Sequence, residues 1–391
     1  MSNQRPQATS QKAAQFQESV IREMTRLAVK HKAVNLGQGV PDFPCPLELK
    51  EAAAKAIFAD INQYAITFGD KLLREALAVK YSPALGFDIN PETEITVTCG
   101  ATEALMATIL ALVDPGEEII VFEPFYENYL PQSILGDAVV RTITLQSPRW
   151  QFDVQELEKA FNAKTRAIIV NTPHNPTGKV FNAHELTLIA ELCQKWGVYI
   201  ITDEIYEHIL YDGARHVYPA SLPDMRDLTI TITGFSKTYS LTGWRIGWII
   251  ANSETTAAIR KVHDFLTIGA PAPLQRAAVT GINLPSSFYL DLAQEYSIKR
   301  QYMMETLDKI AMPYFKPEGA YYIFCDVSKY NYVSSLDFAR FLLEEVGVAV
   351  VPGTSFFASK SRQANAFVRF CFSRKQETLA LAREKLWQGK L

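Results

Sequence analysis

Short apolar segments typical of buried strands alternate with stretches typical of helices through the middle of this 391-residue chain. Most of these segments have apolar residues at consecutive positions, so both faces of the predicted strand need cover. Helices on both sides of a parallel or mixed sheet provide that cover, which makes α/β the predicted fold class. The six clearest segments are EITVTCG (94–100), EEIIVF (117–122), TRAIIVN (165–171), VYIITDE (198–204), DLTITITG (227–234) and IGWIIAN (246–252).

The helices between these strands have recognisable starts and ends. ATEALMATILALV (101–113) follows the first strand and predicts a helix. A second helix is predicted over residues 183–196, because Asn182 and Glu185 have the spacing of a capping box. Gly197 directly follows this second helix, and glycine is the residue type that most often ends a helix.

The pattern changes after about residue 285, where we expect a second, smaller α/β domain. We assign residues 1–45 and 286–391 to this domain, with an N-terminal helix at about 14–30 docked on it. Residues 46–285 form the predicted large domain. The expected elements of the C-terminal part are helices at 290–310, 335–345 and 374–389 and strands at 319–327, 348–351 and 367–372.

Composition excludes several classes of protein. The net charge of −3 gives no basic field for nucleic acid. No apolar run approaches the ~20 residues that a membrane-spanning helix needs, and the polar first residues lack the apolar core of a signal peptide. The five cysteines are scattered without metal-ligand spacing, which indicates reduced thiols, no metal site and a cytoplasmic protein.

Polar or small residues follow four of the predicted strands at their carboxyl ends. Ligands of open α/β sheets bind beyond the carboxyl ends of the strands, so these four segments should line one cleft. The segments are CGATEA (99–104), NTPHNPTG (171–178), TDEIY (202–206) and TGFSK (233–237).

Each segment has a structural and a ligand-binding interpretation. The small residues of CGATEA open a helix with free N–H groups that suit a phosphate, although most such turns bind nothing. Two prolines hold Asn175 in a rigid loop, where its amide is either structural or a donor to a ligand oxygen. Asp203 follows a buried strand and needs a partner, which is either a structural ion pair or a ligand.

Lys237 and Arg245 are two cations within small and apolar sequence. Most lysines lie on the surface, but Lys237 directly follows a buried strand at the predicted cleft. A lysine in such a pocket loses its charge readily and can form a Schiff base, and Arg245 would supply a permanent charge for a phosphate. Together with Asp203 these features fit pyridoxal 5'-phosphate, whose ring nitrogen needs a carboxylate partner.

Nine segments in a fixed order resemble the fold type I pyridoxal-phosphate enzymes, specifically the class I/II aminotransferases. Within that class the chain is similar to the subgroup of kynurenine, glutamine and methionine aminotransferases. The resemblance covers nearly the whole chain and implies a three-layer sandwich with a mostly parallel seven-stranded sheet, plus a smaller α/β domain. The segments are NLGQGVPDFP (35–44), NQYAITFGDKLLREALA (62–78), GATEAL (100–105), EPFYENY (123–129), NTPHNPTGKV (171–180), TDEIYEHI (202–209), FSKTYSLTGWRIGW (235–248), KPEGAYY (316–322) and VRFCF (368–372).

The resemblance also implies roles for single residues at the cofactor ring. Lys237 is the Schiff-base lysine and later the proton shuttle. Asp203 pairs with the ring nitrogen, and Tyr126 stacks on the ring face, although it could also be an ordinary buried aromatic. Asn175 and Tyr206 hydrogen-bond the phenolic oxygen of the ring.

Further residues are implied for the phosphate, the substrate and a second subunit. The phosphate is held by Gly100, Ala101, Thr102, Ser236 and Arg245. Arg369 binds the substrate carboxylate, and Gly39 lets the backbone approach it. Tyr64 reaches into the site of a partner subunit, which implies a homodimer.

Two positions depart from the family pattern. Gly234 stands where many relatives have a serine that helps to hold the phosphate. Ile268 and Gly269 stand where kynurenine-type relatives have a bulky aromatic residue followed by histidine. The side-chain pocket, which we expect to be lined by Val40, Tyr64, Phe68, Tyr126 and Ile268, has no clear cation and favours neutral amino acids.

The predicted reaction is a ping-pong transamination between a neutral L-amino acid and a 2-oxo acid. A β-lyase that acts on cysteine conjugates uses the same lysine, aspartate and arginine, and an aspartate or broad-specificity aminotransferase is a further alternative. A cofactor-binding transcription regulator is less favoured, because only about 30 residues precede NLGQG and they contain no helix-turn-helix pattern.

Overall fold

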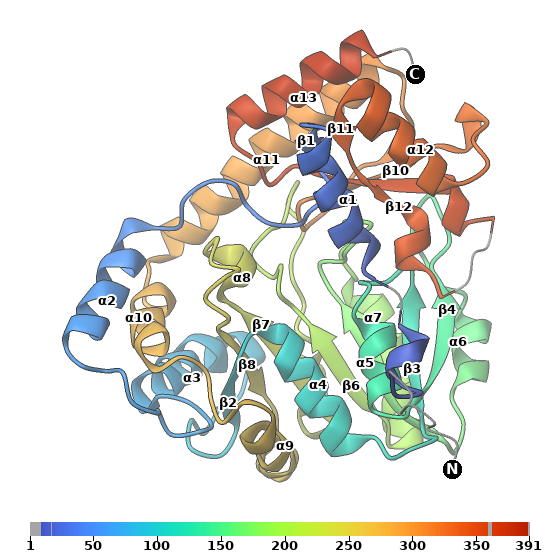
Figure 1. Ribbon diagram of the computed structural model, residues 1–391. Coiled ribbons are helices and arrows are strands. Elements are labelled where there is room, and N and C mark those ends of the chain that lie inside the picture. Colours follow the sequence, from blue (N-terminus) through green and yellow to red (C-terminus); the bar gives the residue numbers. More distant parts are fainter. Residues whose placement is uncertain (1–8, 17, 359–361, 390–391) are drawn as a thin grey trace, which may run out of the picture.

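A seven-stranded sheet forms the centre of the structure (Figure 1). The computed structural model describes residues 9–16, 18–358 and 362–389. The strand order is β2–β8–β7–β6–β5–β3–β4; β8 is antiparallel to both of its neighbours, and all other neighbouring strands are parallel. The predicted mostly parallel sheet is confirmed. Its strands are β2 (Ile95–Thr98), β3 (Glu118–Glu123), β4 (Val139–Thr144), β5 (Thr165–Asn171), β6 (Tyr199–Asp203), β7 (Thr229–Gly234) and β8 (Gly247–Ile250).

Helices cover both faces of this sheet. In β5, Ala167 and Ile169 pack into one hydrophobic cluster, whereas Ile168 and Val170 pack into another on the opposite face. Apolar side chains therefore face both ways, as the consecutive apolar residues predicted. The first face is covered by α4 (Ala101–Leu112), α5 (Tyr129–Leu135) and α9 (Ser253–Thr267). The second is covered by α6 (Val154–Ala160), α7 (Ala183–Trp196), α2 (Leu47–Phe58), α3 (Lys71–Leu85) and α10 (Ala272–Ile282).

The C-terminal part forms a smaller antiparallel sheet in the order β12–β13–β10–β9. Its long helix α11 (Ser286–Lys309) and α13 (Gln376–Gln388) lie next to each other in Figure 1. A short α12 (Ser335–Phe341) continues into a π-helical turn over Leu342–Val346. The strands are β9 (Tyr314–Phe315), β10 (Tyr322–Asp326), β12 (Val351–Pro352) and β13 (Phe367–Cys371).

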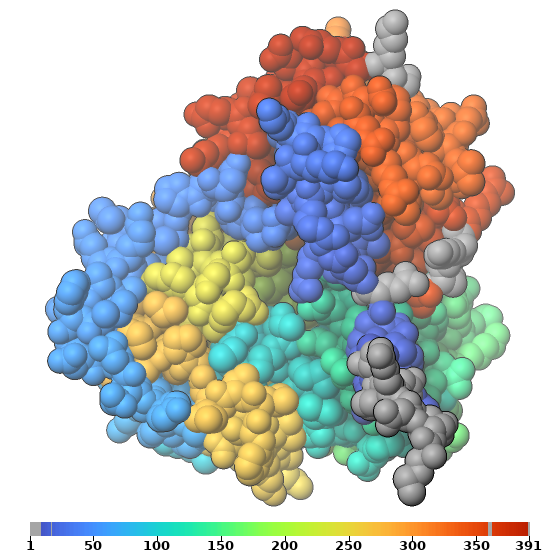
Figure 2. Space-filling view, viewed as in Figure 1, coloured from blue at the N-terminus to red at the C-terminus, as the bar shows by residue number. Residues whose placement is uncertain are grey.

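The N-terminal segment joins this C-terminal part. Strand β1 (Val34–Asn35) pairs with β11 (Val348–Ala349), and buried residues of α1 (Val20–Lys30) belong to the same hydrophobic cluster as β11 and α13. In the space-filling view α1, in dark blue, lies between the orange C-terminal residues and the teal residues of the central part (Figure 2). The predicted docking is confirmed, but the helix begins at Val20, where Ser19 caps it, and not near residue 14.

Two elements of the sheet region differ from the sequence-based expectation. Strand β4 was not predicted, because its residues alternate between exposed and covered positions at the edge of the sheet and lack a continuous apolar run. Lys237 lies on a short helix, α8 (Phe235–Thr238), which the sequence analysis did not predict. The division at residues 46–285 stays a prediction, and its outer limits Met1 and Leu391 lie outside the described residues. None of the helices in the described part is both long and apolar enough to cross a bilayer.

The capping box of α7 is present and gives a test of local stability. The Asn182 side chain accepts from the Glu185 N–H, and the Glu185 carboxylate accepts from the Asn182 N–H, both at 3.0 Å. We expect Asn182→Ala to lower the free energy of unfolding by about 1 kcal/mol, measured by denaturant unfolding, because the Glu185 N–H loses its side-chain acceptor. Thr187→Ala, on the exposed face of the same helix, is the control and should change it by less than about 0.5 kcal/mol. Equal effects of the two changes would contradict this account.

Candidate active site

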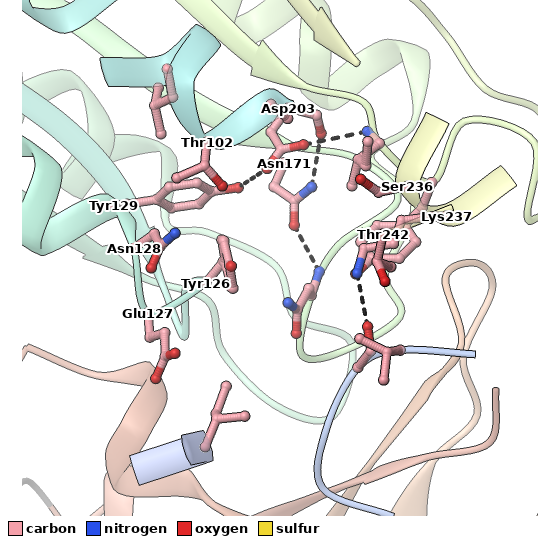
Figure 3. A pocket seen from close by; sticks show the side chains of 18 of the residues that line it. Thr102, Tyr126, Glu127, Asn128, Tyr129, Asn171, Asp203, Ser236, Lys237 and Thr242 are labelled. Carbon is pink, nitrogen blue, oxygen red and sulfur yellow. Dashed lines mark hydrogen bonds between the residues drawn. The ribbon is translucent and has the colours of Figure 1, made fainter. Parts of the chain in front are cut away.

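A cavity of about 450 Å³ lies at the carboxyl ends of the central strands (Figure 3). All four predicted strand-end segments contribute to its wall, so the structure brings them together as expected. Their contributions are Ala101 and Thr102 after β2, Asn171 and Asn175 after β5, Asp203 and Tyr206 at the end of β6, and Ser236 and Lys237 after β7.

Lys237 points into this cavity from α8. Its Nζ donates to the main-chain carbonyl of Gly39 at 2.8 Å. Burial lowers the pKa of Lys237 to about 8; Cys371 and Asp203 oppose this shift, and the guanidinium of Arg369 adds to it. An amine with this pKa is partly uncharged near neutral pH, and the uncharged form is the nucleophile.

Asp203 ends β6 at the inner wall of the cavity. Burial raises the pKa of the Asp203 carboxyl, while the Tyr129 hydroxyl, the Ile205 N–H and the charge of Lys237 act in the opposite direction. Tyr129 donates to Oδ2 at 2.7 Å, and the Ile205 N–H donates to Oδ1 at 3.3 Å. The sequence analysis quoted the segment that contains Tyr129 but did not predict this contact.

A chain of hydrogen bonds links Asp203 to the buried arginine of the smaller sheet. Asn171 donates to the Asp203 carbonyl and accepts from the Asn175 N–H, both at 2.8 Å, as Figure 3 shows. The Asn175 side-chain oxygen in turn accepts from Nη1 of Arg369 at 2.7 Å. Arg369 lies on β13 and also donates from Nη2 to the Gly37 carbonyl at 2.8 Å. Residues from both sheets therefore meet at one wall.

The start of α4 and Arg245 lie together at the cavity, where an anion site is predicted. The N–H groups in the first turn of a helix have no acceptor within the helix, and those of Ala101 and Thr102 lie there. Arg245 adopts a left-handed backbone with φ of 55°. Its guanidinium packs on Gly100, where a Cβ would lie only 2.5 Å from Nη2. Gly100 thus supports the arginine and does not itself line the cavity.

Packing explains the glycine at position 234. A Cβ there would lie 2.8 Å from the Ile246 carbonyl oxygen and 2.9 Å from the Cα of Gly247. Both atoms belong to the backbone of the strand that pairs with β7, so they cannot move without disturbing the sheet. A serine therefore does not fit at this position, and Ser236 is the buried hydroxyl that remains at the cavity.

Tyrosine side chains form much of the remaining wall. Tyr126 and Tyr129 meet edge to face, with ring centroids 5.7 Å apart. The hydroxyl groups of Tyr206 and Tyr322 are 2.9 Å apart, and both residues line the cavity. The contribution of Tyr322 was not predicted, and its place in the quoted KPEGAYY segment was the only signal for it.

The predicted side-chain pocket is only partly present within one chain. Val40 and Tyr126 line the cavity, but Tyr64, Phe68 and Ile268 do not. Tyr64 is 84% exposed and Ile268 is 49% exposed, because both lie on the outer surface of the chain. Phe68 instead packs beneath the guanidinium groups of two arginines. The lining residues that sequence reasoning missed include the buried Leu105 of α4 and, at the more exposed mouth, Ile21, Arg22, Glu127 and Asn128.

The inner cavity carries excess positive charge. In the described part of the chain, no carboxylate lies within ion-pair distance of Lys237, Arg245 or Arg369. Of the two carboxylates that line the cavity, Asp203 lies at the inner wall and Glu127 at the mouth. Three cations and one carboxylate suit a ligand with a phosphate, a ring nitrogen that binds a proton, and a substrate carboxylate nearby. The residues therefore fit pyridoxal 5'-phosphate with its amino-acid substrate.

Comparison with known proteins gives consistent matches. A family model described as aminotransferase class I and II matches residues 31–386. The methionine aminotransferase of Escherichia coli is 35% identical over 383 residues, which cover 98% of this chain and 99% of that protein. Human kynurenine–oxoglutarate transaminase 1 is 33% identical, with 94% of this chain and 95% of that protein covered. The solved structure of N-succinyldiaminopimelate aminotransferase from Mycobacterium tuberculosis is 36% identical with a TM-score of 0.94, and 97% and 99% of the two chains are covered.

The lowered pKa of Lys237 can be measured on the cofactor-free protein. The rate at which acetic anhydride labels Lys237 is measured by mass spectrometry at a series of pH values. We expect this rate to be half-maximal at about pH 8, because burial disfavours the charged amine. A free lysine side chain reaches this point near pH ~10.4, so the exposed lysines of the same sample serve as internal controls. Labelling of Lys237 in parallel with those lysines would show that the cavity does not lower its pKa.

Proposed function

The chain belongs to the aminotransferase class I and II family, and on this basis we propose that it moves the α-amino group of neutral L-amino acids to 2-oxo acids. It is an aminotransferase that depends on pyridoxal 5'-phosphate, and the ping-pong order of half-reactions is general for the family. The observation that carries the proposal is the meeting of three unpaired cations and Asp203 in one cavity at the strand ends.

When bound, pyridoxal 5'-phosphate withdraws electrons from the α-carbon of an amino acid, so that the α-proton can leave. In our proposal Asp203 holds the protonated ring nitrogen, and Asn175 and Tyr206 hydrogen-bond the phenolic oxygen. Tyr126 covers one face of the ring. The phosphate is held by the N–H groups of Ala101 and Thr102, by Ser236 and by Arg245, whose position Gly100 fixes.

Lys237 performs both the attachment and the proton transfer in this proposal. Its Nζ would hold the cofactor covalently. Once free of the cofactor, the same Nζ would take up the α-proton of the substrate and be able to return it. An amine with a pKa near 8 can accept and return a proton near neutral pH, and the Gly39 carbonyl gives it a hydrogen-bond acceptor while it is free.

Arg369 orients the substrate by its carboxylate. The arginine is 1% exposed, and its Nε has no partner in the described part of the chain. Asn175 and Gly37 accept from its two terminal nitrogens and fix the guanidinium plane. A guanidinium fixed in this way can form a bidentate pair with a carboxylate, which places the α-carbon beside Lys237.

Neutral side chains are the substrates that we propose. Ile21, Val40 and Leu105 give the cavity apolar wall, and at its mouth Arg22 and Glu127 have opposite charges. Methionine, aromatic amino acids and glutamine-like donors fit this lining. The names of two relatives, a methionine aminotransferase and a kynurenine–oxoglutarate transaminase, support the same class.

We also propose a homodimer in which Tyr64 completes the site of the partner. Its side chain is 84% exposed, and Phe58 and Phe265 are 87% and 91% exposed. Large exposed aromatic side chains indicate a surface that another chain covers. We further propose that residues 46–285 form a large domain and that the rest of the chain forms a smaller one. A cytoplasmic location is also part of the proposal, and the free cysteines support it.

The substrate class can be tested by visible absorption of the cofactor-loaded enzyme. Single amino acids are added without any oxo acid, and conversion to the pyridoxamine form is followed. We expect methionine and phenylalanine to convert the enzyme at least ~10-fold faster than aspartate, because Ile21, Val40 and Leu105 give the cavity apolar wall, and the further cation of the lining, Arg22, shares it with the Glu127 carboxylate. Faster conversion by aspartate would contradict the proposal. A band that persists while pyruvate accumulates from a sulfur amino acid would indicate a β-lyase. Lys237→Ala is the control, and conversion by this variant would refute the assigned role of the lysine.

Mixing two inactive variants tests whether Tyr64 acts across subunits. In a hybrid dimer of Lys237→Ala and Tyr64→Ala chains, one site combines a native Lys237 with the native Tyr64 of the partner. We expect about a quarter of wild-type activity after random mixing, since half of the dimers are hybrids with one complete site each. Each variant alone should be at least ~10²-fold less active than wild type. No recovery in hybrids isolated by two affinity tags would contradict the cross-subunit role.

A further inference from the structure

Tyr322 lies between the two groups that are proposed to bind the cofactor ring and the substrate. It is the first residue of β10, and its hydroxyl is 2.9 Å from that of Tyr206. The guanidinium carbon of Arg369 lies 4.1 Å from the centre of its ring, within the range of a cation–π contact. One buried side chain thus touches both groups.

The position of the Tyr322 hydroxyl is fixed by its surroundings. A Cβ at Gly39 would lie 2.1 Å from this oxygen, so the hydroxyl fills the space that a side chain at position 39 would need. Tyr322 is also held by the pairing of β10 with β13, where it lies opposite Cys371. The hydroxyl can rotate its proton but cannot move away from Tyr206.

Counting protons gives the direction of the hydrogen bond in the working enzyme. Each hydroxyl has one proton, so only one of the two tyrosines can donate to the other. If Tyr206 donates to a ligand in the cavity, its oxygen is left to accept, and Tyr322 becomes the donor. Burial raises the pKa of both hydroxyls, so both keep their protons near neutral pH. The neighbouring Tyr321 has an acceptor of its own, because its hydroxyl donates to the Gly39 carbonyl at 2.9 Å.

We propose that Tyr322 is a positioning residue whose hydroxyl donates to Tyr206 and thereby strengthens the hydrogen bond from Tyr206 to the phenolic oxygen of the cofactor. The aromatic ring of Tyr322 also makes a cation–π contact with the guanidinium of Arg369. This inference rests on the proposed function, because it assumes the ring contact of Tyr206. Chains of hydrogen bonds polarise one another, which makes the second bond stronger when the first is present.

The proposal predicts a change in the spectrum of the bound cofactor. A hydrogen-bond donor to the phenolic oxygen stabilises the negative charge of this oxygen. That charge is least compensated when the Lys237 nitrogen bonded to the cofactor has lost its proton. A weaker donor therefore disfavours the form without this proton, and raises the pH at which the visible absorption band of the bound cofactor changes. For Tyr322→Phe we expect this midpoint to rise by roughly 0.2–0.5 pH units, since the effect is indirect.

Two substitutions separate the hydroxyl from the ring. Tyr322→Phe keeps the ring beneath Arg369, so the KM for the amino acid should change by less than about 2-fold. Tyr322→Leu removes both features and should raise KM roughly 3–10-fold. The leucine variant must also give the upward spectral shift, so the test remains decisive if one variant does not fold. A midpoint equal to that of wild type in the folded variants would overturn the proposal.

Tyr296→Phe is the matched control. Tyr296 is a buried tyrosine that stacks on Tyr321, but its hydroxyl contacts Ser373 at 3.0 Å and does not line the cavity. Its loss should leave the spectral midpoint unchanged. A midpoint that rises equally in this variant would show that any buried hydroxyl has the effect, and would overturn the specific role of Tyr322.

Tyr206→Phe distinguishes failure of this inference from failure of the proposed function. It should raise the midpoint by about 1 pH unit or more, because it removes the direct donor. Adding Tyr322→Phe to it should cause no further rise, since the second hydroxyl acts through the first. No shift in Tyr206→Phe would refute the ring contact itself. A shift there without one in Tyr322→Phe, or additive shifts, would refute only the relay from Tyr322.

Discussion

Main-chain carbonyls of residues 35–40 accept hydrogen bonds from three cations, Lys237, Arg369 and Arg374. Gly39 accepts from Lys237 and Gly37 accepts from Arg369, each at 2.8 Å. Arg374 donates to the carbonyls of Asn35 and Gln38 in the same segment. A desolvated cation needs hydrogen-bond acceptors, but carbonyls are neutral and do not cancel its charge. The cavity therefore keeps the positive charge that an anionic ligand can use, and this arrangement depends on the N-terminal segment being docked between the two sheets.

The fold could be predicted where a buried segment has a continuous run of apolar residues in the sequence. Strands such as β5 and β6 are covered on both faces, so each has a continuous apolar run, at 167–170 and 199–201. The rule that ligands bind at strand ends then places Asp203 and Lys237 together. Strand β4 lies at the edge with one covered side, and its alternating pattern is too weak to distinguish it from a loop. The short helix α8, which carries Lys237, packs through Phe235 against Trp248 of β8, and no local sequence pattern indicates this contact.

The residues that could not be predicted are those whose function depends on a distant neighbour. Tyr129 meets Asp203 across 74 positions of sequence, and Tyr322 meets Tyr206 across 116. A tyrosine in either place looks like an ordinary core aromatic until the fold brings its hydroxyl to a partner. The same holds for Gly234 and Gly39, because what excludes a side chain at each is an atom of another strand.

The lining of the cavity comes from two kinds of chain segment. The inner wall with Asp203 and Lys237 belongs to the ends of hydrogen-bonded strands, whereas Ile21 and Arg22 at the mouth lie on α1, outside the seven-stranded sheet. A substitution on α1 can alter the shape of the opening without breaking any ladder of the sheet. Ancestors of such a chain could therefore exchange one amino-acid preference for another by drift in a single peripheral helix, while selection kept the chemical centre intact. Laboratory evolution toward new amino donors would begin most economically at these same positions.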